Sequence, residues 1–380
     1  MVRTELFLWD LELFLQIQKY FKERVVLKGG AAVQFYLPAT AQRTSIDIDI
    51  LFSGSKKEIE SVLVEIHKNF GNDENLFVFT PYSPKKPKTT LPLFTFYVDV
   101  PTVLSGKERG DRNTELSQNC QELKVEFIIQ NDSIPHVEKT GNDLFIGDSP
   151  FLYNILPLND LFADKLTTLG PNTIGVQEDR KDEQIKQFYD ICLLLENNLQ
   201  SLDVDIVRNK YWVRSKDECK ARDISFSVSD ISEDVLKQLN GFAMVDFGFE
   251  EYKSLINDIN NFKSLYLNRK IDFSPQNIAC GARKIQMFLT DLYVHSVSKN
   301  TLIQAMIISD RLSLAEFEGE KKGFVSKELR KKLIDQFAKC SKLPPKLLTG
   351  KNPRRIFWEI ANQSNLSEID NVITEILLSI

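Results

Sequence analysis

Two acidic residues, Asp47 and Asp49, stand two positions apart in a segment with the alternation of a β-strand. Ile46, Ile48 and Ile50 occupy the intervening positions, a pattern typical of a strand with one buried face. We therefore expect the two carboxylates to share the opposite face, close enough to bind the same one or two divalent cations. Carboxylate oxygens are hard ligands and favour magnesium or manganese.

A Gly-Gly pair precedes this acidic strand. Residues 23–28 have the composition of a short strand, and residues 31–37 read as the start of a helix. Gly29 and Gly30 between them let the backbone approach a ligand closely, and free N–H groups at the helix start suit a triphosphate tail. Most Gly-Gly pairs mark ordinary turns. Next to the two aspartates, however, this pair points to metal-assisted phosphate chemistry.

Both motifs resemble those of the polymerase-beta-like nucleotidyltransferase superfamily, and more narrowly the AbiEii/AbiGii toxin family. Members of that family carry Lys-Gly-Gly-Thr-Ala-Leu followed by Arg-x-Ser-x-Asp-x-Asp, and the corresponding strings here are Lys28–Val33 and Arg43–Asp49. The second string matches at every defining position, including Ser45. In the first, Ala31 replaces the usual threonine, so this chain lacks any contact that the threonine hydroxyl makes.

A two-metal site needs a third acidic ligand from a neighbouring strand. Glu126, within the strand-like residues 123–129, is our first choice, and the resemblance implies a carboxylate on such a later strand. Asp99, within residues 94–100, is the alternative. Either residue could instead be a solvated strand position.

Two later helices carry further residues that the resemblance implies. One resembles the family's Ala-Asp-Lys-Leu motif, and its Lys165 is expected to meet the nucleotide phosphates. Its neighbour Asp164 either pairs with that lysine or faces water. The other resembles the Lys-Asp-x-Tyr-Asp-Leu motif, where Asp190 matches the second aspartate and Gln187 replaces the first. Asp190 is expected to position Lys165 or the nucleotide.

Length and composition are those of a globular protein. The 380 residues favour two or three domains, and the chain has no run of roughly 18 apolar residues that would predict a membrane span. Five cysteines without close pairing favour free thiols in a reducing, cytoplasmic setting over a disulfide framework or a zinc site. The three scattered histidines do not support histidine-based nucleophilic catalysis.

We expect an α/β (α+β) nucleotidyltransferase-type domain with a mixed sheet over residues 1–148 and a mainly helical region over residues 149–380. The helical region would complete the nucleotide site and bind the acceptor. Strands are expected near Val25, Asp47, Phe77, Phe96, Glu126 and Leu144. Helices are expected at 157–169, 182–196, 234–239, 250–267, 277–297, 302–308, 327–341 and 367–378. Loops 81–92 and 105–121 are either flaps over the site or ordinary connectors.

A basic segment, residues 319–355, interrupts the slightly acidic average of the chain. It holds twelve Lys and Arg residues against three acidic ones, a local charge of +9. Such a surface suits an RNA backbone, and nearby aromatic side chains could stack on bases: Phe324, Phe337, Phe357 and Trp358. The alternative is a solvated helix pair whose aromatic residues form a core.

Together these features predict transfer of a nucleoside monophosphate from an NTP to an acceptor hydroxyl. Mg²⁺ or Mn²⁺ would be held by Asp47, Asp49 and Glu126, and the phosphates would be held by Gly29, Gly30, Ser45 and Lys165. The resemblance implies the toxin of a type IV toxin–antitoxin or abortive-infection system in phage defence. It also implies a separately encoded antitoxin and an RNA acceptor such as a tRNA 3′ end.

Three alternatives to RNA modification remain open at this point. The first is an AMP-transferring modifier of proteins with the same fold. The second is a GT-A-like glycosyltransferase, which also uses an Asp-x-Asp strand but lacks a Gly-Gly turn this close upstream. The third is a non-catalytic nucleotide-binding module.

Overall fold

A computed structural model describes most of the chain: residues 2–69, 76–82, 93–102, 120–267, 271–294, 299–315, 322–340 and 344–361, with 366–367, 370–371 and 374. Two compact units are present. The first comprises Met1–Lys165, Val213–Phe226 and Leu265–Ile271, and the second comprises Leu166–Trp212, Ser227–Ser264 and Asp272–Ile380. The domain boundary expected after residue 148 stays a prediction.

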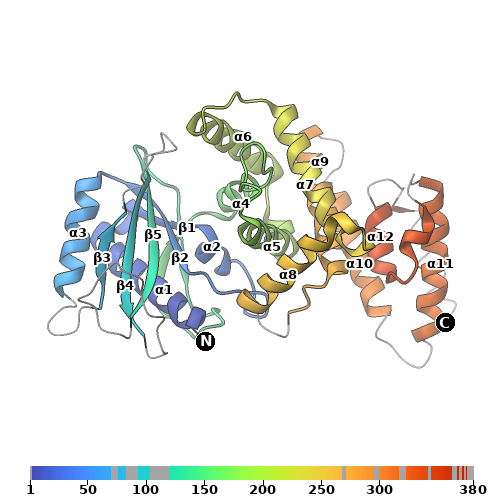
Figure 1. Ribbon diagram of the computed structural model, residues 1–380, viewed down its shortest axis with the longest axis horizontal. Helices are drawn as coiled ribbons and strands as arrows, with labels where there is room; N and C mark the ends of the chain where they lie inside the picture. The colour runs from blue at the N-terminus through green and yellow to red at the C-terminus, as the bar shows by residue number, and fades with distance from the viewer. Residues whose placement is uncertain are drawn as a thin grey trace. The chain divides into compact units, whose positions relative to one another are not determined.

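A seven-stranded mixed sheet forms the first unit (Figure 1). Its strands are β1 (Val25–Lys28), β2 (Asp47–Ser53), β3 (Val78–Pro81), β4 (Leu93–Pro101), β5 (Cys120–Gln130), β6 (Val137–Thr140) and β7 (Leu152–Ile155). Their order across the sheet is β3-β4-β5-β2-β1-β7-β6. Strand β2 runs antiparallel to β1 and parallel to β5. The expected mixed sheet is confirmed.

Alternation along β2 separates a buried face from a polar face. Ile48, Ile50 and Phe52 are completely buried, whereas Asp47 and Asp49 are half-buried. Helix α1 (Val2–Phe21) packs on the buried face, where the Phe21 ring lies 4.4 Å from that of Phe52. The other face of the strand is therefore left for the polar side chains.

The strand expected near Leu144 is absent, and strands β6 and β7 lie on either side of that position. Leu144 lies in a turn, where its N–H donates to the carbonyl of Gly141, between β6 and β7. The Gly141 N–H and the Ser149 carbonyl close the same turn at 2.9 Å. Gly141 and Gly147 interrupt the pattern around Leu144, and the chain reverses there instead of extending.

Helices make up most of the remaining described structure. They are α1 (Val2–Phe21), α2 (Gly29–Gln34), α3 (Lys56–Asn69), α4 (Leu158–Leu166), α5 (Lys181–Asn198), α6 (Val204–Ala221), α7 (Val228–Met244), α8 (Lys253–Tyr266), α9 (Pro275–Val294), α10 (Lys299–Ala315), α11 (Lys322–Cys340) and α12 (Pro353–Ile360). Short 3₁₀ turns occur at Lys22–Arg24, Leu199–Ser201, Val245–Phe247, Glu250–Tyr252 and Pro345–Leu348. The mainly helical second half is confirmed. Helices α6 and α12 in that half, and α1 at the start of the chain, were not expected.

The second unit has a buried ionic cluster at its centre. Arg355 on α12 is completely buried and donates hydrogen bonds to Glu359, Asp246 and the Ala243 carbonyl. Arg283 on α9 also bonds both oxygens of Glu359 at 3.0 Å. Burial alone would raise the pKa of Glu359, but the two guanidinium groups hold it below the ordinary value. The cluster therefore ties α9 and α12 together with the turn after α7.

No helix in the described part of the chain is long and apolar enough to span a membrane. The described cysteines Cys120, Cys192, Cys219 and Cys280 are free thiols, as the sequence predicts.

Candidate active site

Strand register brings the acidic residues of β2 and β5 to one face of the sheet. Asp49 is the direct partner of Glu126, and Asp47 is the direct partner of Lys124, in parallel pairing. Directly paired residues on neighbouring strands point to the same side. Strands β2 and β5 therefore carry three carboxylates and one ammonium in adjacent positions on the polar face.

The glycine turn lies directly against this group. Gly29 begins α2 with a φ of +69°, a left-handed conformation that glycine adopts without strain. A Cβ atom at this position would lie 1.9 Å from Oδ2 of Asp49. Lys28, the residue before the turn, is the antiparallel partner of Asp49 on β1. The sequence requires glycine here because Asp49 leaves no room for a side chain.

Asp49 has an unusual electrostatic environment. Burial, together with the negative charges of Glu126 and Asp47, raises the pKa of Asp49 to about 6, against the opposing effect of Lys28 and Lys165. Because the charge of Lys165 lowers the pKa of Asp49, Lys165 lies within electrostatic reach of that carboxylate. A cation bound here would relieve the repulsion among the acidic groups.

The expected divalent cation fits the donor chemistry of this face. Asp47 and Asp49 offer carboxylate oxygens on one side of a strand, and Asp49 is disfavoured as an uncompensated anion. Glu126 is already engaged, because its oxygens accept from Lys124 Nζ at 2.9 Å and Thr95 Oγ1 at 3.2 Å. Among the residues that the structure describes, no three His, Cys, Asp or Glu side chains are arranged as a metal-binding group. Asp47 and Asp49 fit a cation, whereas Glu126 is held by a lysine.

The alternative third carboxylate, Asp99, lies farther along the sheet. It is the partner of Glu122 on β5, four residues before Glu126, and of Val78 on β3. The geometry thus favours Glu126 over Asp99 as the neighbour of the aspartate pair.

An ion pair connects β1 to helix α4. Lys28 Nζ lies 2.9 Å from Oδ1 of Asp164, and both side chains are largely buried. Burial would raise the pKa of Asp164, but Lys28, Arg214 and Lys165 together lower it below its ordinary value. Asp164 therefore pairs with the lysine of the Gly-Gly motif. Lys165, the next residue of α4, is 3% exposed.

The remaining expected site residues have different surroundings. Ser45 is buried just before β2, with its hydroxyl 3.5 Å from the Asp47 carbonyl. A Cβ on Gly30 would meet Arg43 Nη2 at 2.8 Å and Ser45 Oγ at 3.0 Å, so Gly30 lies against the segment that leads into β2. Asp190 is completely buried on α5 in the second unit, and its contact with the nucleotide stays a prediction.

Three charged residues near the carboxylates were not expected from the sequence. Lys124 bonds Glu126, and Arg214 on α6 acts electrostatically on both Lys28 and Asp164. Asp10 on α1 is 1% exposed and is affected by the charges of Asp47 and Asp49. The position of Asp10 within the apolar run of α1 could have indicated a buried charge. Lys124 stands two residues before Glu126 on a strand, so the sequence could have indicated that the two side chains share a face. No feature of the sequence around Arg214 indicates that it lies near the carboxylates.

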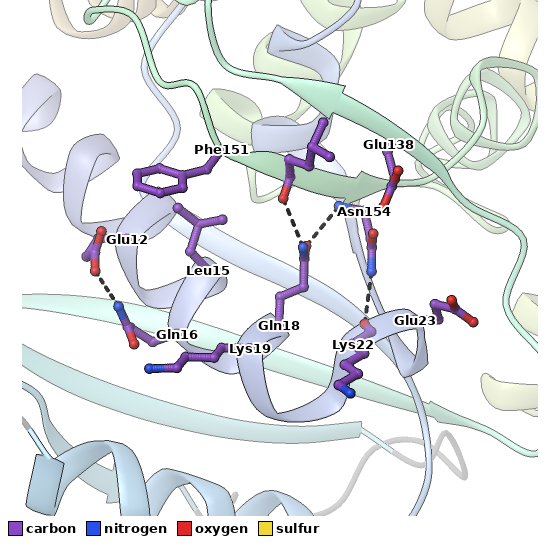
Figure 2. A pocket seen from close by; sticks show the side chains of 11 residues that line it. Glu12, Leu15, Gln16, Gln18, Lys19, Lys22, Glu23, Glu138, Phe151 and Asn154 are labelled. Atoms are coloured by element: carbon purple, nitrogen blue, oxygen red, sulfur yellow. Dashed lines mark hydrogen bonds between the residues drawn. The ribbon is translucent and has the colours of Figure 1, made fainter.

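A pocket of about 470 Å³ lies elsewhere on the first unit. It is bounded by α1, the 3₁₀ turn after it, and strands β6 and β7 (Figure 2). The Gln18 amide crosses the pocket to bond the Leu152 carbonyl and the Asn154 N–H. None of the expected site residues lines this pocket.

The basic segment is only partly a free surface. Phe337, Phe357 and Trp358 are buried, so the expectation that they stack on bases is wrong, and they belong to the core. Arg355 and Lys351 form ion pairs with Asp246. The side chain of Phe324 lies outside the described residues. Among the described side chains of the segment, five lysines are exposed: Lys327, Lys331, Lys332, Lys339 and Lys346.

A mixed sheet that sets two aspartates of one strand beside a glycine turn and buried lysines is the arrangement of a nucleotidyltransferase. The family model of the nucleotidyl transferase AbiEii toxin, of type IV toxin–antitoxin systems, matches residues 13–269. That match spans more than half of the chain, which therefore belongs to the AbiEii nucleotidyltransferase toxin family. Membership implies a nucleoside triphosphate substrate and a separate antitoxin partner. It makes the chain an enzyme of this class and replaces the glycosyltransferase and non-catalytic alternatives.

Two solved structures are similar to the chain at low identity. MenT4, a nucleotidyltransferase toxin from Mycobacterium tuberculosis H37Rv, has 16% identity and a TM-score of 0.42, covering 78% of this chain and 86% of that one. JHP933 from Helicobacter pylori has 15% identity and a TM-score of 0.34, covering 77% of this chain and 98% of that one. No curated protein matches this chain.

Proposed function

We propose that this nucleotidyltransferase moves a nucleoside monophosphate from an NTP to a hydroxyl of an RNA acceptor, such as a tRNA 3′ end, and that it needs a divalent cation. The close approach of Gly29 to Asp49, in register with Glu126, is the observation that carries this proposal. It puts a side-chain-free stretch of backbone beside a group of carboxylates. A triphosphate and its cation need that combination.

In the proposed reaction the acceptor oxygen forms a bond to the α-phosphorus while the bond from that phosphorus to the β-phosphate oxygen breaks. Pyrophosphate leaves with the electron pair of the broken bond, and the hydroxyl proton passes to solvent. A divalent cation, when bound at Asp47 and Asp49, supplies charge neutralisation for the phosphates and lowers the pKa of the acceptor hydroxyl. The remaining work falls to residues of the chain.

The lysines have separate tasks in this proposal. Lys165, which lies within electrostatic reach of Asp49, neutralises a phosphate of the bound nucleotide. Lys28 is paired with Asp164 at 2.9 Å, so its ammonium does not form an ion pair with Asp49 in place of the cation. Gly29 and Gly30 line the phosphate path together with Ser45, and Asp190 orients the nucleotide.

Exposed lysines of residues 319–355 support RNA as the acceptor. Lys331 and Lys332 are adjacent and exposed on α11, where they can meet backbone phosphates without stacking partners. Recognition would then depend mainly on charge and not on the aromatic residues, which are buried. A protein acceptor is the competing outcome of the test below.

The experiment combines pure protein, Mg²⁺ and each α-labelled NTP in turn with either total RNA or a protein extract. We expect label in the RNA fraction from one preferred NTP, and no label when a chelator is present. Label that appears only on protein would replace the RNA proposal with the protein-modifying alternative. Label that persists in chelator would contradict the role of the cation.

A further inference from the structure

The pairing of Lys124 with Glu126 bears on how many divalent cations the site holds. Lys124 Nζ lies 2.9 Å from Oε2 of Glu126, and their side chains are 35% and 21% exposed. Both residues are on β5 with one residue between them, so they lie on the same face. Thr95 on β4 donates a second hydrogen bond to Glu126 at 3.2 Å. Glu126 is thus held by two partners from the protein itself.

Strand register places the Lys124 ammonium inside the acidic group. Lys124 is the direct partner of Asp47, just as Glu126 is the direct partner of Asp49. The Lys124 ammonium, which is bonded to Glu126, therefore lies on the same face as Asp47 and Asp49.

Charge balance then distinguishes one divalent cation from two. Asp47, Asp49 and Glu126 together with Lys124 carry a net charge of −2, and the charge of Lys28 on the same face is balanced by Asp164. Lys165 also acts on Asp49, so a single divalent cation is enough to neutralise the group. A second divalent cation would leave the group with a net charge of +2 and would have to displace the ammonium from Glu126. Like charges at such short separations repel strongly in a partly buried site.

We infer that the Lys124 ammonium occupies the second cation position of this site, so that Asp47 and Asp49 hold one divalent cation and Glu126 holds the lysine. This inference rests on the proposed function and narrows it, because the sequence alone predicts two cations shared by all three carboxylates. Lys124 is a positioning residue in this account. It fixes Glu126 and supplies a permanent positive charge beside the cation.

Counting bound Mn²⁺ by electron paramagnetic resonance in the nucleotide-free protein tests this directly. The wild-type chain should bind one Mn²⁺ per molecule. Lys124→Met removes the ammonium and should create a second binding position, whereas Lys124→Arg keeps the charge and should bind one. Lys124→Met with Glu126→Gln should return to one. Lys68→Met is the matched control, because Lys68 pairs with Glu65 at 3.3 Å on α3 in the same unit, and its count should not change.

Glu126→Gln alone gives an answer that does not depend on how Lys124→Met folds. Because Glu126 does not hold the cation, Glu126→Gln should still bind one Mn²⁺ per molecule, and its Mn²⁺ affinity should fall less than that of Asp49→Asn, which removes a ligand. Two Mn²⁺ per wild-type molecule, or an Mn²⁺ affinity that falls as far in Glu126→Gln as in Asp49→Asn, would overturn the inference but leave the proposed function intact. No Mn²⁺ binding to any variant would overturn both.

Discussion

Gly29 and Asp49 are so close that no side chain fits between them. A Cβ at Gly29 would lie 1.9 Å from Oδ2 and 2.8 Å from Cγ of Asp49. The contact joins the turn after β1 to the middle of the acidic strand, and it fixes the place where a ligand can meet both backbone and carboxylate. It also explains why the motif needs glycine on physical grounds.

Gly29→Ala should therefore abolish transfer by displacing Asp49. We expect a loss of at least about 100-fold in nucleotide incorporation, because small displacements of a reacting group have effects of this size. Gly248→Ala is the control, since Gly248 has a similar φ of +75° but nothing within 4 Å of its Cβ position. Gly29→Ala should lose at least as much stability as Gly248→Ala in thermal unfolding, because it adds a clash to the strained φ. Equal activity in both variants would refute the role of the contact.

Lys28 and Asp164 should be energetically coupled. Both are largely buried and joined at 2.9 Å, so a double-mutant cycle with Lys28→Met and Asp164→Asn should give a coupling of about 0.5–3 kcal/mol in urea unfolding. Arg24 and Glu58 form an exposed pair in the same unit, and the equivalent cycle there should give less than about 1 kcal/mol. Additive effects at Lys28 and Asp164 would show that the pair does not fix the lysine.

Asp10 should make the stability of the protein depend on pH. Both of its carboxylate oxygens are buried without a hydrogen-bond partner among the described residues. Burial, together with Asp47 and Asp49, raises its pKa well above 3.8. The folded state therefore binds a proton more tightly than the unfolded state. This stabilisation is complete below the unfolded pKa and is lost as the pH rises through the folded pKa.

Asp10→Asn removes that titration. At pH 7 the variant should be more stable than the wild type, by about 1–3 kcal/mol in the free energy of unfolding. The difference should shrink as the pH falls toward 4. Urea unfolding at a series of pH values measures it. A variant that is equally destabilised at every pH would mean that Asp10 has an unseen polar partner.

The exposed lysines of α11 should contribute to RNA binding. Replacing Lys331 and Lys332 by Glu should weaken tRNA binding and reduce the slope of log affinity against log salt by about 1 to 2, since each lost phosphate contact changes that slope by about 0.7–0.9. Lys56→Glu with Lys57→Glu on α3 is the control, because this adjacent pair is also exposed. Equal salt slopes in both variants would exclude α11 from the RNA surface.

Much of the candidate site could be predicted from the alternation of apolar residues and from the position of the Gly-Gly pair. The pattern around Ile48 and Ile50 correctly placed Asp47 and Asp49 on one face, and the short distance in sequence to Gly29 made their proximity a reasonable prediction. Glu126 could be proposed because its strand has the same alternation. What the sequence did not predict is the register, which alone decides that Glu126 and not Asp99 faces Asp49.

Other features depend on contacts between distant segments. Asp164 was expected beside Lys165 or in water, whereas its partner is Lys28, on a strand 136 residues earlier. Arg355 belongs by composition to the basic segment, yet it is buried because Asp246 and Glu359 surround it. Local charge density does not reveal such burial. The prediction of a strand near Leu144 was wrong because the flanking glycines reverse the chain there.

If Asp47 and Asp49 hold the divalent cation needed for nucleotide transfer, replacing either one should stop the reaction. The most direct measurement is the rate of Mg²⁺-dependent incorporation of the preferred labelled NTP into RNA by Asp47→Asn and Asp49→Asn, beside wild type and Lys68→Met. We expect a loss of at least about 100-fold in each aspartate variant, with thermal unfolding midpoints no lower than that of the wild type, and full activity in Lys68→Met. Incorporation at the wild-type rate by either aspartate variant would contradict this expectation.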